Sequence, residues 1–247
     1  MNTHTPRQAV SALRAHRTLD DDNGDRFAGY GIMGIPFSSG HYLALRDMVA
    51  SSVGPPYRSI WHRDPQSQWT IHTSVDPDRS CPRYFGAGAV VDRQPIDVSW
   101  TGDHEFEVTL GDTIRWRLVL TPSPATRLMS SMGSALPAAA WDDNALLKSM
   151  GPMASTLLGA GRIRLCGTTP NSQWFQAQPR VVYRVASSTA TIGGIDIGTP
   201  AGLHRQIRLG DLWLPQRGVF FVGTARFTPD WAAATGKTAR REPAVTR

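Results

Sequence analysis

Residues 57–75 read YRSIWHRDPQSQWTIHTSV, and this stretch decides the fold class. Bulky or β-branched side chains occupy every second position in two short runs, which the turn-forming residues 64–67 join. Alternation of this kind on both sides of a turn predicts a β-hairpin with one apolar face. We expect the face that carries Trp61 and Trp69 to be the inner one.

The same period of two recurs through most of the chain and predicts an all-β, mainly antiparallel protein. The 23 Gly and 18 Pro residues suit many short strands joined by tight turns. The expected strands are 29–35, 41–50, 58–63, 69–75, 84–91, 96–100, 105–110, 113–120, 162–166, 174–178, 180–185, 189–192, 207–213 and 219–227.

A helical pattern interrupts the strands. Apolar residues recur with a spacing near 3.6 from Asn144 to Leu158, although Pro152 predicts a kink or two shorter helices there. The fold is therefore expected to be a lipocalin-like barrel, or two packed barrel-like halves, with a short helical insert. The expected organisation is a flexible arm over 1–26 with one short helix between Thr5 and His16, a first β unit over 27–120, a helical insert or linker over 121–160, a second β unit over 161–230 and a flexible basic tail over 231–247.

The charge and the apolar content of the chain argue against two classes of partner, nucleic acids and membranes. Half of the formal net charge of +6 lies in residues 236–247, so the remaining chain is only mildly basic and a nucleic-acid partner is not expected. The longest apolar runs fall far short of the roughly 20 residues of a membrane-spanning helix, and the N-terminal residues lack the apolar core of a secretion signal. A cytoplasmic protein is expected, with Cys81 and Cys166 as reduced thiols. The sequence does not indicate an oligomeric state.

No sequence motif identifies a reaction. The chain contains no nucleophile elbow, zinc-protease motif or paired-cysteine motif, so neither a metal site nor a cofactor is predicted. Residues 29–34, GYGIMG, match the letters of a dinucleotide fingerprint. However, they follow a polar segment and precede Pro36, so glycines that accommodate a strand bend are the better interpretation.

The aromatic and basic residues suggest a ligand cavity. Tryptophan walls with a few polar groups at the entrance are typical of an apolar small-molecule site. His41 heads a strand at the expected rim, where it could act as a general acid or base; a hydrogen-bonded histidine at a strand end is the alternative. His62 and His72 share one side of the hairpin and could approach each other. The residues expected to bind ligand are Trp61, Arg63, Trp69, Tyr84, Trp116, Trp213 and Arg217.

Arginines at strand ends have two interpretations. Arg63 and Arg217 could anchor a ligand carboxylate at a barrel mouth, or they could belong to a solvated outer face.

Three stretches carry a resemblance to a known family: GYGIMGIPFSSGHYLAL at 29–45, YRSIWHRDPQSQWTI at 57–71 and LGDLWLPQRGVFFVGTARF at 209–227. They resemble an actinobacterial group that is similar to lipocalin-like (calycin) proteins of the carotenoid hydratase and AttH type. The resemblance implies paired calycin-like barrels and, in some members, hydration, cyclisation or isomerisation of a terpenoid, polyene or polyketide. The first hypothesis is therefore a protein that encloses a hydrophobic small molecule. The alternative is a non-catalytic carrier or protein-interaction module with a filled core.

Overall fold

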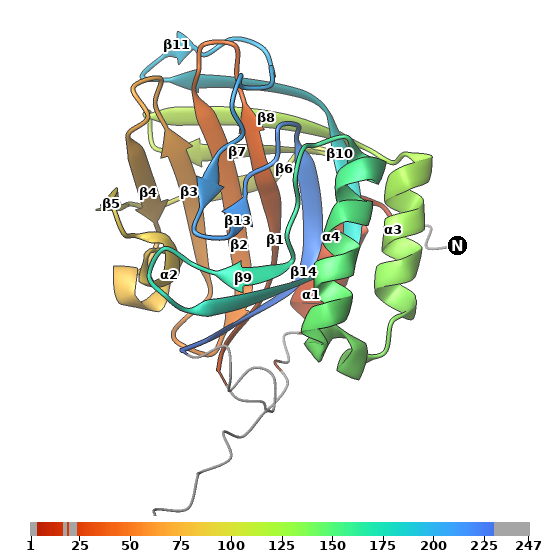
Figure 1. Cartoon of the computed structure of the whole chain (residues 1–247). Helices are drawn as coiled ribbons and strands as arrows, with labels where there is room; N and C mark the ends of the chain where they lie inside the picture. Colours follow the sequence, from red (N-terminus) through yellow and green to blue (C-terminus); the bar gives the residue numbers. More distant parts are fainter. Residues whose placement is uncertain (1–3, 17–18, 20–23, 230–247) are drawn as a thin grey trace, which may run out of the picture.

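One curled sheet contains most of the strands (Figure 1). The computed structural model describes residues 4–16, 19 and 24–229. The strands of this sheet are β1 (Asp25–Pro36), β2 (Tyr42–Ser51), β3 (Tyr57–Arg63), β4 (Trp69–Thr73), β5 (Ala89–Arg93), β6 (Asp97–Trp100), β7 (Glu105–Leu110), β8 (Ile114–Thr121), β9 (Cys166–Thr168), β10 (Trp174–Ile192), β11 (Ile195–Asp196) and β14 (Val219–Thr228). A second sheet pairs β12 (Arg208–Leu209) with β13 (Leu212–Trp213).

The strand order is β5-β4-β3-β2-β1-β14-β10-β8-β7-β6, with β9 and β11 also paired to β10. Neighbouring strands are antiparallel except β4 and β5, which run parallel. The expectation of a mainly antiparallel, all-β fold is thus confirmed. Strands β10 and β14, from the expected second unit, lie between β1 and β8 of the first, so both segments build the same sheet. The division into separate units stays a prediction.

The helices lie outside the sheet. They are α1 (Pro6–Ala15), α2 (Pro82–Phe85), α3 (Pro124–Ala135) and α4 (Asn144–Leu158), with short 3₁₀ turns at Pro77–Arg79 and Ala138–Asp142. The predicted bounds of α4 are confirmed, and Pro152 lies inside the helix. Helix α3 was not expected. Its Ser123 cap, whose side chain accepts a hydrogen bond from the Thr126 N–H, explains why the helix begins there.

Helix α1 confirms the helix expected between Thr5 and His16, and it packs against the sheet, while the flexibility expected for the whole of 1–26 stays a prediction. Val10 is buried in a cluster on the inner face of the sheet, and the Tyr183 hydroxyl donates a hydrogen bond to the His4 carbonyl. The basic tail expected over 231–247 lies outside the described residues.

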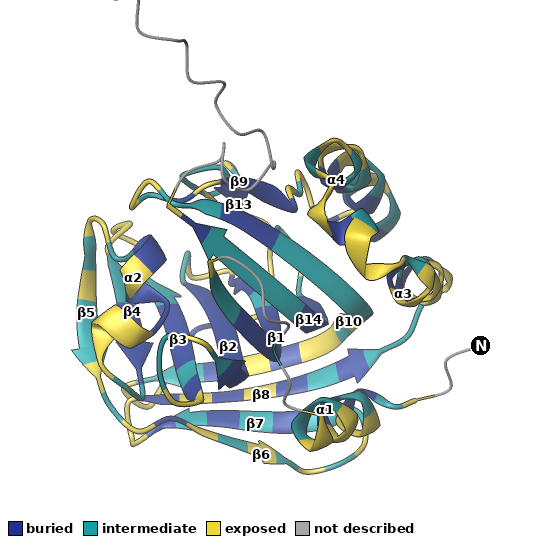
Figure 2. Ribbon diagram, turned by 90° about the horizontal axis from the view of Figure 1, so that it is seen from below, coloured by how far each residue is buried: buried dark blue, intermediate teal, exposed yellow. Residues whose placement is uncertain are grey.

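The sheet curls because β10 is long and irregular. Its register shifts at Pro179/Val181 against β14 and at Val185/Ser187 against β8, and such bulges increase local bend and twist. Three separate strands were expected here. The structure has one strand over 174–192, because the register shifts are irregularities within the strand and do not end it. The curl places β6, β7 and β8 across the face of β1, β2 and β3 (Figure 2).

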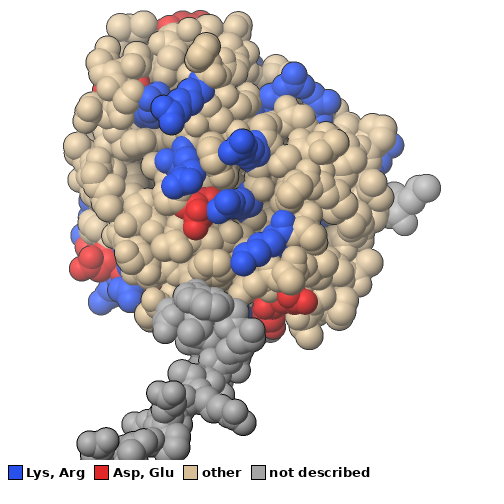
Figure 3. All heavy atoms as spheres, in the orientation of Figure 1, with Lys and Arg blue, Asp and Glu red and all other residues tan. Residues whose placement is uncertain are grey.

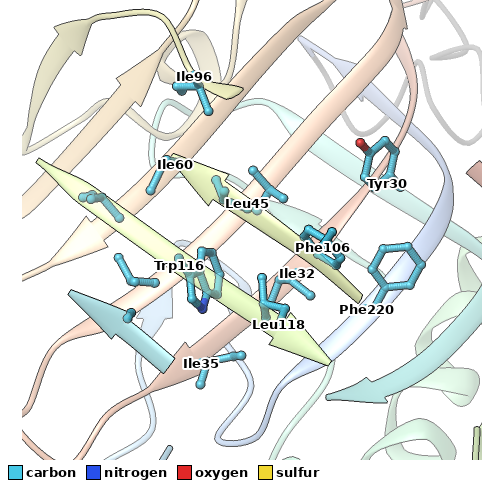
Figure 4. Packing of buried hydrophobic residues seen from close by; sticks show 14 of the residues in the cluster. Tyr30, Ile32, Ile35, Leu45, Ile60, Ile96, Phe106, Trp116, Leu118 and Phe220 are labelled. Atoms are coloured by element: carbon cyan, nitrogen blue, oxygen red, sulfur yellow. The ribbon is translucent and has the colours of Figure 1, made fainter. Parts of the chain in front are cut away.

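Buried side chains pack the hollow of the curled sheet. Side chains from opposite walls of the hollow approach one another there: Leu45 of β2, Ile60 of β3, Phe106 of β7, Trp116 of β8 and Phe220 of β14 (Figure 4). The expected empty barrel interior is therefore a filled core, which contributes about 1.5–3 kcal/mol for each large apolar side chain fully buried.

The Trp61 face of β3 points the other way. It belongs to a second buried cluster on the outer face of the sheet, with Tyr42, Tyr57 and Phe85. The expectation that this face is the inner one is wrong. Ile60 on one face of β3 and Trp61 on the other are both buried. The alternation of residues along the strand therefore could not show which of the two faces is the inner one.

No helix within the described ranges has the combination of length and apolar character needed to cross a membrane.

Candidate functional site

A cavity of about 130 Å³ lies between the outer face of the sheet and the segments that cover it. Strands β1, β2, β3, β10 and β14 supply its floor. Helices α2, α3 and α4, residues 163–165 and the β13 region cover it. The lining is predominantly apolar. Its larger apolar side chains are Phe27, Met33, Met48, Trp61, Phe85, Met129, Leu158, Ile163, Leu165, Phe175, Val182, Leu212, Trp213, Val219, Phe221 and Phe227.

Arg46 is the buried cation of this cavity wall. It lies in the middle of β2 and is only 6% exposed. Gly31 is its direct partner in the β1–β2 register and also pairs with Phe221 of β14. Because Gly31 has no side chain, the Arg46 guanidinium reaches across it, and its Cζ lies 5.4 Å from the Phe221 ring centre and 4.8 Å from that of Trp61. A Cβ at Gly31 would collide with the Leu45 carbonyl oxygen.

The hydrogen bonds of Arg46 go to backbone carbonyls. Its Nη1 donates to the carbonyl oxygens of Ile32 (2.6 Å) and Leu45 (2.9 Å), and its Nη2 donates to that of Met33 (3.5 Å). The register of β1 against β2 shifts between Ile32 and Ile35, and Met33 lies within this irregular stretch, so the carbonyls that Arg46 binds lie at and beside the bulge.

Arg46 has no carboxylate partner within the described part of the chain. Among the residues that the structure describes, no Asp or Glu forms an ion pair with it, and none lines the cavity. Burial lowers the pKa of Arg46, because the charged form has lost its water without gaining a counter-charge. A residue of the cavity wall thus carries a buried positive charge.

Neutral polar groups surround this charge. The Tyr57 hydroxyl lies 3.4 Å from the Cys81 Sγ. Burial is the main cause of the raised pKa of both groups, so they are uncharged at neutral pH. The buried indole Nε1 of Trp61 forms no well-formed hydrogen bond in the described structure, although its contact with Cys81 acts to lower the pKa of that thiol. The described residues of this part of the cavity wall therefore include hydrogen-bond donors and no anionic side chain.

Three of the residues expected to bind ligand meet at the cavity: Trp61, Tyr84 and Trp213. Tyr84 belongs to α2 rather than to the strand expected over 84–91. Its ring stacks on Phe227 with centres 3.9 Å apart, and its hydroxyl donates to Asp25 (2.8 Å).

His41, the expected proton donor or acceptor, does not line this cavity. It pairs with His62, with Nδ1 and Nε2 2.9 Å apart and ring centres 5.1 Å apart. Burial lowers the pKa of His41, and burial together with the neighbouring His41 and His72 lowers that of His62 to about 4. His72 instead contacts Asp92 at 2.9 Å. Over 4–16, 19 and 24–229, no group of three or more His, Cys, Asp or Glu side chains is placed to hold a metal ion.

The remaining expected residues lie apart from the cavity wall. Arg63 reaches Ser67 in the turn between β3 and β4. Trp69 packs edge-on against Tyr42, and Arg217 is exposed in the connection before β14. Trp116 belongs to the filled core, where its Nε1 donates to Ser188 Oγ (2.8 Å).

Sequence reasoning missed Arg46, Tyr57 and Cys81. A signal for Arg46 exists in β2, where residues 42–50 read YLALRDMVA and both faces of the strand are buried. Charged residues inside an apolar strand of that kind require a partner or a function.

A surface groove of about 870 Å³ adjoins the cavity. The two share Ile163, Arg164, Leu165 and Trp213, so the groove is the expected route of entry. Its charged residues are Lys148, Arg162, Arg164 and Asp211. Figure 3 shows Lys and Arg side chains gathered on the face that carries α4, β9 and β13.

Comparison with known proteins identifies no family. No family model matches the chain, and no curated protein matches it. The crystal structure of acetoacetate decarboxylase from Legionella pneumophila subsp. pneumophila str. Philadelphia 1 is similar at 9% identity with a TM-score of 0.37, over 86% of this chain and 88% of that chain. A "putative AttH" from Nitrosomonas europaea is similar at 12% identity with a TM-score of 0.30, over 92% of this chain and 57% of that chain.

The second of these structures shares the AttH name with the resemblance inferred from the sequence. At these TM-scores neither structure supports a conclusion about function, and no finding connects the chain with an actinobacterial source.

Proposed function

We propose that the protein binds a compact apolar small molecule in the cavity on the outer face of the sheet. The cavity itself is the observation that carries the proposal: about 130 Å³ of space with a predominantly apolar lining. An engineered cavity of about 150 Å³ with a similar lining stays dry and binds benzene. Trp61, Tyr84 and Trp213 are the proposed ligand contacts, since all three line this space.

Cavity size favours a small ligand over the polyenes, terpenoids and polyketides that the sequence resemblance suggests. Pockets for drug-sized ligands have volumes of about 300–1,000 Å³, several times the 130 Å³ available here. Binding without chemical conversion is the better-supported activity, because His41 pairs with His62 and is not among the residues that line the cavity. The cytoplasmic location and the absence of a nucleic-acid partner stay predictions.

The test is a titration of the protein with benzene and toluene, and with retinol as an oversized ligand. Trp61 and Trp213 contact the cavity, so binding changes tryptophan fluorescence. At a ligand concentration 100 times Kd, binding to the folded state alone adds about 2.7 kcal/mol of stability, which raises Tm by about 5–10 °C in a chain of this size. The proposal predicts these changes with benzene or toluene and not with retinol. The absence of any response to the compact compounds would refute it.

A further inference from the structure

Two adjacent residues of β2 show how unusual the environment of Arg46 is. Asp47, on the opposite face of the strand, lies 3.3 Å from Arg14 Nη2 and 3.2 Å from Arg58 Nε, and it accepts a hydrogen bond from the Tyr30 hydroxyl (2.7 Å). Buried charges in proteins are ordinarily paired in this way. Arg46 is equally buried, yet its partners are three carbonyl oxygens and two aromatic rings.

The carbonyl contacts satisfy donors of Arg46 without balancing its charge. An ionised group taken out of water is costly unless a counter-ion approaches it. Since Arg46 is one of the residues that line the cavity, a ligand inside could bring a counter-ion to its guanidinium.

The neighbouring groups favour an anion as well. The Trp61 Nε1 has no well-formed hydrogen bond and can only donate one, and the Tyr57 hydroxyl, which is protonated and contacts the Cys81 Sγ, can donate as well. No acidic side chain among the described lining residues would repel a negative charge. Along the adjoining groove Arg164 pairs with Asp211 (2.7 Å), which leaves the charges of Lys148 and Arg162 in excess, and a net positive charge raises the rate at which anions arrive.

We propose that the ligand of this cavity is a compact monocarboxylate, with its carboxylate on Arg46 and its apolar body against the aromatic lining. The inference rests on the proposed function, because it names the chemical class of the molecule bound at the same site. A planar carboxylate matches the planar guanidinium, and the 130 Å³ volume limits the apolar body to about the size of a benzene ring.

The first experiment compares benzoate with benzamide on the wild-type protein by isothermal titration calorimetry. The two ligands have nearly the same shape and differ in charge. A hydrogen-bonded charge pair predicts about 10- to 100-fold tighter binding of benzoate. Equal affinity, or tighter binding of benzamide, would overturn the inference.

The second experiment separates the carboxylate from the neutral acid without any substitution. Tyr42, Tyr57 and Cys81 around Arg46 have pKa values raised mainly by burial, so they keep their charge state across neutral pH. If the anion binds, benzoate affinity stays constant from about pH 6 to about pH 8, because the carboxylate is ionised throughout. If the cavity takes up the neutral acid instead, affinity falls about tenfold for each pH unit, which would contradict the proposal.

The third experiment uses Arg46→Met, with Arg115→Gln as the matched control. Arg115 lies on β8, 75% exposed, so its loss removes one positive charge away from the cavity. Arg46→Met is expected to lose the preference for benzoate over benzamide, whereas Arg115→Gln keeps it. A preference lost in Arg164→Gln but kept in Arg46→Met would overturn the assignment, because Arg164 also lines the cavity.

The outcomes also separate this inference from the proposed function. If toluene binds but benzoate has no advantage over benzamide, the cavity binds ligands and the carboxylate assignment fails. If neither benzene nor toluene binds, the proposed function itself fails. If Arg46→Met does not fold, the wild-type comparisons still decide whether the ligand is a carboxylate, and Arg164→Gln decides between the two arginines of the lining: a kept preference for benzoate supports Arg46, and a lost one overturns the assignment.

Discussion

A larger side chain that projects into the cavity is expected to stabilise the folded protein and to prevent ligand binding. Ala154 on α4 is buried and lines the cavity, so Ala154→Leu directs three additional carbon atoms into the space. Cavities in protein cores cost about 24 cal/mol per Å³, so the 130 Å³ here corresponds to about 3 kcal/mol. Filling about half of it predicts a gain of about 1.5 kcal/mol in the free energy of unfolding, or about 3–6 °C in Tm.

The assay is urea unfolding followed by tryptophan fluorescence, together with toluene titration of each variant. Ala145→Leu makes the same chemical change on an exposed position of the same helix. It is expected to change stability by no more than about 0.5 kcal/mol and to leave binding intact. If Ala154→Leu instead destabilises the protein by about 1–3 kcal/mol, the site is already filled and overpacking is the cause. That result, or unchanged toluene affinity, would refute the placement of the cavity.

Three further predictions concern the surroundings of the site. Asp47→Asn removes the shared charge from Arg14 and Arg58 and is expected to lower the urea-unfolding free energy by about 2 kcal/mol; a change below about 0.5 kcal/mol would contradict the pairing. Trp116→Phe is expected to cost about 2–3 kcal/mol of stability while leaving toluene affinity unchanged, since Trp116 lies in the filled core; weakened binding would place it at the ligand. His62 has a pKa of about 4 in the folded protein against 6.5 unfolded, so the unfolded chain takes up a proton first and stability declines as pH falls from about 6.5 towards 4. His62→Gln is expected to flatten that part of the stability-pH profile, and an identical profile in both proteins would show that His62 does not cause the decline.

The sequence predicted the strands better than it predicted their faces. The hairpin of residues 57–75 is confirmed as β3 and β4, and the glycines of 29–34 lie in a bulged strand rather than in a nucleotide-binding turn. The aromatic face of that hairpin was expected to be inside the barrel, but it lies on the outer face of the sheet. A period of two identifies which residues share a face, and it cannot say which face encloses the core when other segments cover both.

The same ambiguity explains why the residues expected to bind ligand lie on two different faces of the sheet. Trp61 and Trp213 line one cavity, while Trp116 lies on the opposite side of the sheet. Which of these residues lie together depends first on the path of β10, because its bulges bend the sheet. It depends also on the segments that place α2 and β13 over the outer face of the sheet. These are long-range features that local alternation does not encode. Arg46 could have been noticed as a charge within an apolar strand, but its lack of a carboxylate partner required the structure.

The most direct measurement of ligand binding in this cavity is a ¹³C-methyl NMR titration of the methionines with toluene. Met33, Met48 and Met129 line the cavity, whereas Met132, Met150 and Met153 do not. Binding in the proposed place predicts shifts of the first three methyl signals, caused by the ring current of the ligand, and little change in the other three. Shifts confined to Met132, Met150 and Met153, or no shift at all at saturating toluene, would contradict the central claim.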